Sequence, residues 1–558
     1  MLSCQTMNKT PLYLCILTIF GLIIFASGLF QLPVTDRDEA LFAQASKQML
    51  ESHNFGKIQV QNKARHLKPP GIYWLQALSA KTFGTAKHLS IGLFRIPSAL
   101  GALLSIIILF LGMKRLMGET TAFIGSMLLA ACILLIIEAH IATTDAMLLV
   151  TMIIMQLGLM QIYWQHREQK IKTLDPAVKP RDDNSLGCIL FWFGMALGVL
   201  IKGITPLVGF ATLFFLILID KDTSLFKKIK PLFGILFLIL FSLAWLIPFS
   251  IFGKSNFLLD MIHGDVVPKL IGGQQSHGAW PGYFLLLFPI MFWPGSLFII
   301  KGIAHAWQNK THTIRRFLIA WIIPSWIIFA LIPTKLPQYV LPVYPAIALL
   351  IAAGIKQQLT NKWRYAECGM KIIWGIYSTV LLVFLCLLPR LLREPYSWIQ
   401  VLCLIILLII IIVGMLFYHR PRKILITFFI GTVLFYPLLF SFFLPQINNL
   451  WLSCKITNYI QSLPKNYITD KKPLLINKYH EPSLIFLLGT YKIKFVNDKN
   501  WLLKQIKQHT NNVIILDQLT YQEFTNQISL PIKKTIIGFN YNGGHWIKLH
   551  VIPGQNSH

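Results

Sequence analysis

Long apolar stretches alternate with short polar ones along most of this chain. A helix needs about 20 mostly apolar residues to cross the roughly 30 Å of hydrocarbon in a bilayer. The pattern therefore predicts a polytopic α-helical membrane protein with about thirteen transmembrane helices. The predicted segments lie near 11–31, 93–113, 120–137, 143–163, 187–201, 204–220, 231–252, 282–300, 316–333, 338–356, 370–389, 398–418 and 422–444.

Three of these segments leave alternatives open. The segments at 187–201 and 204–220 are separated only by Lys202 and Gly203, so they are two short helices or one broken helix. The first segment ends in a weak cleavage region, Ala26-Ser27-Gly28, so it is a first span or a signal peptide.

Beyond residue 444 the pattern changes to short apolar runs between polar residues. PLLINK, SLIFLLG, NVIILD, KTIIGFN and HWIKLHVI have the length and composition of strands, and Lys499 through Gln508 is typical of a helix. We predict a transmembrane domain at 1–444, followed by a small soluble α/β domain at 445–558.

Composition and charge support this division. The chain has 558 residues, of which 55% are hydrophobic and 13% charged, whereas globular proteins carry about 25% charged residues. The net charge of +29 does not indicate nucleic acid as a partner, because the basic residues gather in alternate loops between the apolar segments. The positive-inside rule places those loops and the N-terminus in the cytoplasm, and the C-terminal domain on the other side of the membrane.

Two loops on the predicted outer side of the membrane, 33–92 and 253–281, carry most of the candidate chemistry. In the first, Arg37, Asp38 and Glu39 stand directly after an apolar segment, and EALFAQASKQML has the spacing of an amphipathic helix at the membrane interface. Acids are also favoured at any helix N-terminus, so a purely structural role stays open for them.

Two lysines lie in proline-constrained turns on the same side. Lys68 precedes Pro69-Pro70 and the interfacial aromatic residue Tyr73, and Lys335 precedes Pro337 and Tyr339. Such turns hold an ammonium group at the depth of a lipid phosphate. The alternative for each is a lysine that extends to the surface along an apolar wall.

Other polar residues on this side are weaker candidates. Asp145 opens an apolar helix, where an ionisable residue is a functional candidate by default, although it is also a competent helix cap. Lys202 interrupts an apolar run, and we interpret it as a lysine in a loop. The loop 253–281 contains His263, Asp265, Lys269 and His277, but none has the compact spacing of a strong zinc motif, so no metal or other cofactor is predicted.

These motifs together resemble the GT-C glycosyltransferases that use polyprenyl-phosphate sugars. The resemblance is to the branch containing the 4-amino-4-deoxy-L-arabinose lipid A transferases, with relatives among the bacterial protein O-mannosyltransferases. It covers about residues 10–355 and rests on TDRDEALFAQA, LKPPGIYWLQA, GGQQSHGAWPGYFLLLFP and TKLPQYVLPVYPAIALL.

The resemblance implies a multi-pass enzyme of the bacterial inner membrane. On the periplasmic face, such an enzyme moves a sugar from a polyprenyl-phosphate donor to an envelope acceptor, a glycolipid such as lipid A or a protein, with inversion of the sugar's configuration. It implies catalytic roles for Asp38 and Glu39. It implies contacts with the phosphate of the sugar donor for Lys68, Arg37, Lys269 and Lys335, and a place in the substrate cavity for Tyr73, Asp145, His263 and Tyr339.

Two residues depart from the family pattern. Leu41 stands where the arabinose transferases often have arginine, and Leu67 stands where they often have a glutamate that helps to hold a metal. The alternatives to a transferase are a lipid-linked sugar transporter and a non-catalytic protein of envelope assembly. A transporter should carry charged groups near the bilayer midplane and repeated halves, and neither is evident here.

Overall fold

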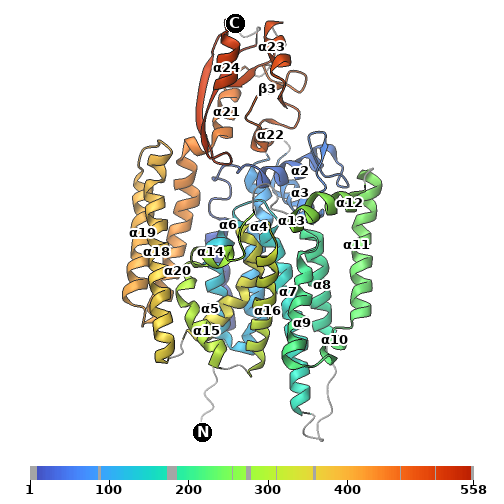
Figure 1. The fold of residues 1–558 in the computed structure, drawn as a ribbon, viewed down its shortest axis with the longest axis vertical. Helices are drawn as coiled ribbons and strands as arrows, with labels where there is room; N and C mark the ends of the chain where they lie inside the picture. Colours follow the sequence, from blue (N-terminus) through green and yellow to red (C-terminus); the bar gives the residue numbers. More distant parts are fainter. Residues whose placement is uncertain are drawn as a thin grey trace.

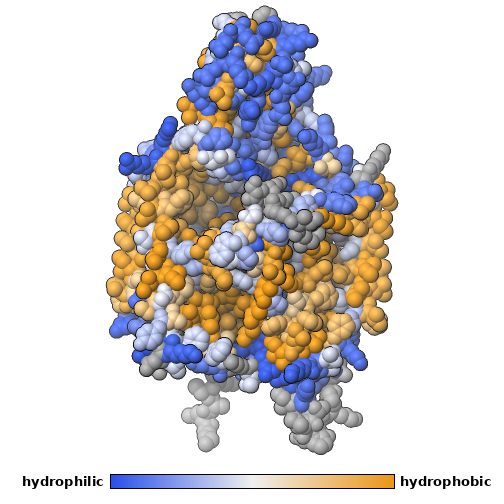
Figure 2. All heavy atoms as spheres, viewed as in Figure 1, coloured by the Kyte–Doolittle hydropathy of each residue, from blue (hydrophilic) through white to orange (hydrophobic). Residues whose placement is uncertain are grey.

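The computed structural model describes residues 9–85, 89–172, 185–253, 256–271, 278–308, 311–355, 360–464, 467–508 and 511–554. A bundle of long helices carries a layer of short helices at one end, and the C-terminal domain sits on that layer (Figure 1). The N-terminal end of the chain lies at the opposite end of the bundle. On the face drawn in Figure 2, a broad apolar band crosses the bundle, with polar surfaces above and below it.

The bundle matches the predicted spans. Within the described residues, nine helical segments are long and apolar enough to cross a membrane, and two bent helix pairs raise that number to eleven. Two shorter apolar helices correspond to the remaining two predicted segments. The nine segments are formed by α4 (Ile91–Met117), α7 (Asp145–Lys172), α8 (Ser185–Lys202), α11 (Pro231–Gly253), α16 (Thr313–Leu331), α17 (Tyr344–Gly354) with the turn before it, α18 (Asn361–Leu391), α19 (Trp398–Leu416) and α20 (Pro421–Leu438).

The bent pairs and short helices complete the bundle. The pair α5 (Glu119–Ala130) and α6 (Ile133–Ala139) is bent by 63°, and α14 (Tyr283–Met291) is bent by 110° against the helical stretch that ends with α15 (Ile299–Gln308). The short helices are α1 (Thr10–Ala26) and α9 (Val208–Asp220). The region around Lys202 and Gly203 is therefore a break between two helices, because α8 ends at Lys202 and Gly203 adopts a positive φ of 62°.

The first predicted loop folds into a compact unit. It contains α2 (Asp38–Ser52), a small antiparallel pair β1 (Gln59–Val60) and β2 (Lys63–Ala64), and α3 (Gly71–Phe83). The prolines before Gly71 stop any earlier helix, as the sequence predicts. The sequence predicts that α2 lies at the membrane interface with one side exposed. In the structure most of α2 is buried, because α22 of the C-terminal domain packs against it.

The second predicted loop is largely helical. The elements α12 (Phe257–Met261), η2 (Ile262–Val266) and α13 (Val267–Ile271) follow one another without a break. The predicted candidate His277 lies outside the described residues.

The C-terminal domain has one mixed sheet of five strands in the order β4-β3-β5-β7-β6. The strands β4 (Ile493–Phe495), β3 (Leu474–Ile476) and β5 (Ile514–Asp517) are parallel, whereas β7 (His545–Ile552) and β6 (Lys534–Asn540) form an antiparallel hairpin at one edge. Its helices are α21 (Leu452–Gln461), α22 (Pro482–Leu488), α23 (Lys499–Lys507) and α24 (Gln518–Thr525).

One strand prediction in this domain is wrong. The run SLIFLLG forms helix α22, because Pro482 suits the first turn of a helix and Gly489 ends it with a positive φ of 124°. A short apolar run has no periodicity that separates a buried strand from a buried helix.

Candidate active site

A hollow opens where the long helices meet the layer of short helices. Its larger part has a volume of about 370 Å³ and a mainly apolar wall. A smaller part of about 100 Å³ adjoins it and is lined by Asp38 and Arg65. Lys68, Asp145 and Tyr339 line both parts, so the two form one continuous cavity with an apolar and a polar end.

A carboxylate between two lysines forms one wall of this cavity. Lys68 Nζ donates to Asp265 Oδ2 at 2.5 Å, and Lys269 Nζ donates to Asp265 Oδ1 at 2.6 Å. Lys68 projects from the turn before α3, and Asp265 and Lys269 project from η2 and α13, so two distant loops meet here. Burial, together with the nearby Lys269 ammonium, lowers the pKa of Lys68 to about 7. Burial acts to raise the pKa of Asp265, but the Lys68 and Lys269 charges hold it below its ordinary value.

A second ion pair also lines the cavity. The Lys202 ammonium at the end of α8 donates to Asp145 Oδ1 at the start of α7. A cation at a helix C-terminus and an anion at a helix N-terminus are both favoured by the helix dipoles. The Lys202 Nζ also lies 5.2 Å from the centre of the Tyr339 ring. The Tyr339 hydroxyl is buried and has no hydrogen-bond partner among the described residues.

Asp38 occupies the polar end of the cavity as the first residue of α2. Its side chain is 66% exposed, and its ion pair with Arg65 is long, at 3.7 Å from Oδ1 to Nη2. Arg65 is itself held over the ring of Phe42, 5.4 Å from its centre. Asp38 is therefore accessible to a ligand and lies beside a cation.

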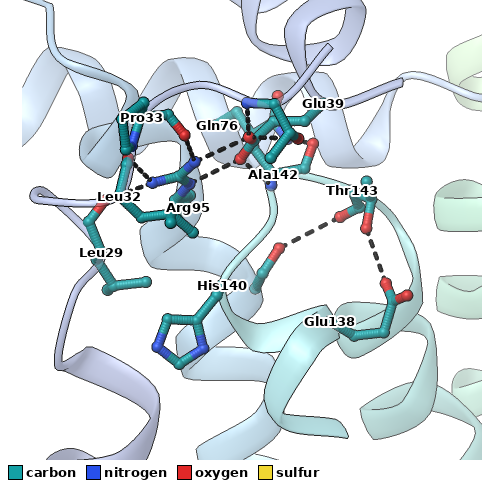
Figure 3. A network of polar contacts seen from close by, with 12 residues as sticks. Leu29, Leu32, Pro33, Glu39, Gln76, Arg95, Glu138, His140, Ala142 and Thr143 are labelled. Atoms are coloured by element: carbon teal, nitrogen blue, oxygen red, sulfur yellow. Dashed lines mark hydrogen bonds and ion pairs between the residues drawn. The ribbon is translucent and has the colours of Figure 1, made fainter. Parts of the chain in front are cut away.

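Glu39 lies in a different environment, although it follows Asp38 directly. It is fully buried, and its carboxylate accepts hydrogen bonds from Nε and Nη2 of Arg95 at 2.7 and 2.8 Å (Figure 3). Thr35 donates to Glu39 through both its backbone N–H and its hydroxyl, each at 2.8 Å, and the backbone N–H of Ala142 donates at 2.9 Å. Arg95 in turn donates to three backbone carbonyls, those of Leu29, Leu32 and Pro33. Glu39 lines neither part of the cavity.

The structure separates the other predicted residues from this cavity, since none of them lines either part of it. Arg37 points to the C-terminal domain, where its Nη2 lies 3.5 Å from the Asn542 carbonyl. Lys335 is buried and donates to the Ile332 carbonyl at 2.6 Å. Tyr73 is buried beneath Phe42, with ring centres 5.2 Å apart, and His263 is exposed on η2.

Lys202, Asp265 and Arg65 also line the cavity. The sequence analysis interpreted Lys202 as a loop lysine, named Asp265 only as a weaker candidate, and did not single out Arg65. The position of Lys202 next to an apolar segment was a usable signal, because an ionisable residue at membrane depth is costly unless it is paired. Arg65 and Asp265 carry no such signal in the sequence. Their place in the site follows only from how the two loops meet.

The charges in the cavity fit a phosphate ligand. Lys68, Lys202, Lys269 and Arg65 supply four positive charges, and Asp38, Asp145 and Asp265 supply three negative ones, which leaves 4 − 3 = +1 when all are ionised. A phosphodiester with a charge of −1 neutralises this excess. Within the described ranges no group of three or more His, Cys, Asp or Glu side chains could hold a metal ion.

Known proteins that are similar to this chain also have names that refer to phosphate-linked sugars. Residues 67–245 match the family described as dolichyl-phosphate-mannose-protein mannosyltransferase. The undecaprenyl phosphate-alpha-4-amino-4-deoxy-L-arabinose arabinosyl transferase of Wigglesworthia glossinidia brevipalpis is 25% identical over 365 residues, which cover 65% of this chain and 61% of the relative. A protein of the same name from Pseudomonas fluorescens is 24% identical, with 69% of each chain covered. The alignment thus spans about three fifths of the length of the Wigglesworthia relative.

Solved structures share the fold. The crystal structure of ArnT from Cupriavidus metallidurans in the apo state superposes with a TM-score of 0.72 at 17% identity, covering 97% of this chain and 98% of that one. The same protein bound to undecaprenyl phosphate gives a TM-score of 0.70 at 16% identity, covering 98% of each chain. The archaeal oligosaccharyltransferase AglB from Archaeoglobus fulgidus gives 0.53 at 10% identity and covers 92% of this chain and 70% of that one. The predicted resemblance and fold class are confirmed, and the chain is a multi-pass inner membrane protein.

Proposed function

We propose that this chain, which has the fold and the motifs of the GT-C glycosyltransferases of the ArnT group, transfers a sugar from a polyprenyl-phosphate donor to lipid A. The observation that carries the proposal is the single cavity in which a carboxylate, Asp38, and a cluster of lysines around Lys68 face the same space. A phosphate-linked sugar bound to the lysines would present its anomeric carbon toward that carboxylate.

The apolar end of the cavity suits the polyprenyl chain. Ile204, Leu207 and Ile328 line the cavity and are each more than a third exposed, so its apolar end is open. A lipid in the membrane can therefore enter sideways and keep its tail in hydrocarbon. Its phosphate would then reach Lys68, Lys202 and Lys269 without crossing the bilayer.

The proposed reaction is a displacement at the anomeric carbon. An acceptor oxygen forms a bond to that carbon while the bond from the carbon to the phosphate oxygen breaks, and polyprenyl phosphate leaves with the bonding electrons. Asp38 takes the proton of a hydroxyl acceptor, or orients an acceptor whose phosphate oxygen is already ionised. We infer inversion of configuration, because a single displacement attacks from the side opposite the leaving group.

The lysines would stabilise the departing phosphate. Negative charge grows on the leaving oxygen in the transition state, and fixed cations in a cavity that excludes water act on it far more strongly than in bulk solvent. This assigns the neutralising charge to Lys68, Lys202 and Lys269, with no metal ion required.

The reaction would take place on the periplasmic face, with the N-terminus in the cytoplasm and the C-terminal domain in the periplasm. In support, the end of the bundle opposite Asp38 carries the basic loops around α10 (Ser224–Lys228), which the positive-inside rule places in the cytoplasm (Figure 1). A lipid-linked sugar donor is also consistent with a compartment that has no nucleotide supply.

A reconstituted assay tests the proposal. Purified protein in liposomes receives lipid A and undecaprenyl phosphate carrying radiolabelled 4-amino-4-deoxy-L-arabinose, the sugar in the names of the relatives. We expect labelled lipid A and free undecaprenyl phosphate in equal amounts with the wild type and neither with Asp38→Asn. Labelled donor that crosses the bilayer unchanged, with no labelled lipid A, would favour a transporter and refute the transferase.

A further inference from the structure

The turn that presents Asp38 has an unusual backbone. Arg37 adopts φ 61° and ψ −108°, close to the first central position of a type II′ turn. That position normally takes glycine, because a side chain there meets the backbone. Such a conformation costs about 1–3 kcal/mol and persists only where the surrounding structure holds it in place.

One clamp holds the turn from inside the protein. Glu39 Oε2 accepts both Thr35 hydrogen bonds, and the buried Arg95 fixes the Glu39 carboxylate against α4 (Figure 3). The turn is thereby fixed at both ends, at Thr35 and at Glu39. Asp36, Arg37 and Asp38 lie between these ends.

A second clamp comes from the C-terminal domain. The tip of the β6–β7 hairpin, residues 540–545, reaches down to the turn. The backbone N–H of Asp36 donates to the Tyr541 hydroxyl at 2.5 Å, and the Arg37 guanidinium meets the Asn542 carbonyl. The tip is itself fixed to its domain, because the Asn542 side chain donates to Glu481 Oε2 at 3.0 Å.

Docking of the domain does not depend on this contact. The Gln44 side chain donates to the Thr490 hydroxyl at 2.8 Å, and Lys47 Nζ donates to the Phe486 carbonyl at 2.9 Å. The rings of Phe94 and Phe486 also pack edge to face at 5.5 Å. The Tyr541 hydroxyl therefore acts on the turn rather than on the attachment of the domain.

From this arrangement we propose that the C-terminal domain is a working part of the active site. Tyr541 is a positioning residue: it holds the strained Asp36-Arg37 turn, so that Asp38 faces the cavity. This inference rests on the proposed function only for its catalytic readout. The clamp itself is a physical property that can be measured in a protein with no substrate.

The kinetic test compares Tyr541→Phe with the wild type in the transfer assay. We expect kcat to fall about tenfold, the scale of losing one hydrogen bond and part of the turn's restraint, while the KM for the sugar donor and the melting temperature stay unchanged. Tyr521→Phe, which removes a hydroxyl elsewhere in the same domain, is the matched control. A kcat equal to that of the wild type would overturn the proposal.

A rescue experiment separates positioning from folding. Glycine adopts a positive φ without strain, so Tyr541→Phe combined with Arg37→Gly should recover most of the kcat lost in Tyr541→Phe alone. If the double variant recovers nothing, backbone strain at Arg37 is not the property that Tyr541 controls, and the proposal fails.

Hydrogen exchange measures the clamp without activity. The Asp36 amide should exchange at least about tenfold faster in Tyr541→Phe, whereas α3 should be unchanged. Faster exchange in a protein that transfers no sugar would refute the proposed function and keep the clamp. Unchanged exchange in an active protein would refute the clamp and keep the function.

Discussion

Asp38 and Glu39 follow one another at the start of α2, but their carboxylates lie in opposite environments, one exposed in the cavity and the other buried in the core. The Asp38 side chain is 66% exposed, faces the cavity and has one long ion pair with Arg65. The Glu39 side chain is 1% exposed and accepts from Arg95, Thr35 and Ala142. Successive residues of a helix point about 100° apart, so a two-residue motif can place one acid in a site and the other in the core.

The comparison shows how one motif combines chemistry with support. A carboxylate whose oxygens are fully hydrogen-bonded has no lone pairs left for a substrate, whereas a loosely paired one can accept a proton or orient an acceptor. Glu39 secures the turn on which Asp38 stands. Asp38 remains free for the reaction.

The largest effect is expected at Asp38. Asp38→Asn should lower kcat by about 10²–10⁴-fold, because the amide cannot take a proton, and should leave the melting temperature unchanged. Glu523→Gln, a change to an exposed carboxylate of the C-terminal domain, is the control. An activity within tenfold of the wild type would remove Asp38 from the catalytic role.

Glu39 should behave in the opposite way. Glu39→Gln leaves the buried Arg95 charge without its partner, and breaking a buried pair in this manner costs about 3–5 kcal/mol of stability. Thermal unfolding in detergent measures the loss. A Glu39→Gln protein with wild-type stability but no transfer would instead assign a chemical role to Glu39.

Lys68 should affect binding of the sugar donor. Lys68→Met removes a charge-assisted contact with the phosphate, so the Kd for undecaprenyl phosphate should rise by about 10–100-fold. Lys335→Met sharpens the comparison, since Lys335 lies outside the cavity and should cause a much smaller loss. Equal losses for the two lysines would contradict the phosphate site.

The pH dependence of that binding follows from the environment of Lys68. Burial lowers the pKa of Lys68 to about 7, so the ammonium form that binds phosphate is lost as the pH rises through that value. The Kd should therefore increase above pH 7, by up to about tenfold per unit of pH. Lys68→Arg keeps its charge and should flatten the profile. An identical profile in that variant would assign the dependence to another group.

The smallest effect concerns Asp36, below the hairpin. Burial, together with the nearby Glu481 carboxylate, raises the pKa of Asp36 to about 7. The folded state therefore loses stability as the pH rises from about 4 to 7, because Asp36 binds its proton more tightly when folded. Asp36→Asn should raise the melting temperature slightly at pH 8 and leave it unchanged at pH 4. A rise of the same size at both pH values would exclude this cause.

The spans and several site residues could be predicted from the sequence, because a membrane imposes strong rules. Long apolar runs predict the helices, and charged residues beside them, such as Lys68 and Asp145, stand out. The contribution of Arg65 and Asp265 could not be predicted, because it depends on how the two loops meet. The directions of Arg37 and Lys335 depend on local turns that residue types alone do not specify.

A structure of the protein with undecaprenyl phosphate bound tests the central claim most directly. The account predicts the phosphate between Lys68, Lys202 and Lys269, with the prenyl chain leaving past Ile204 and Ile328 and open space between the phosphate and Asp38. A phosphate bound elsewhere, with this cavity filled by the protein's own side chains, would contradict it.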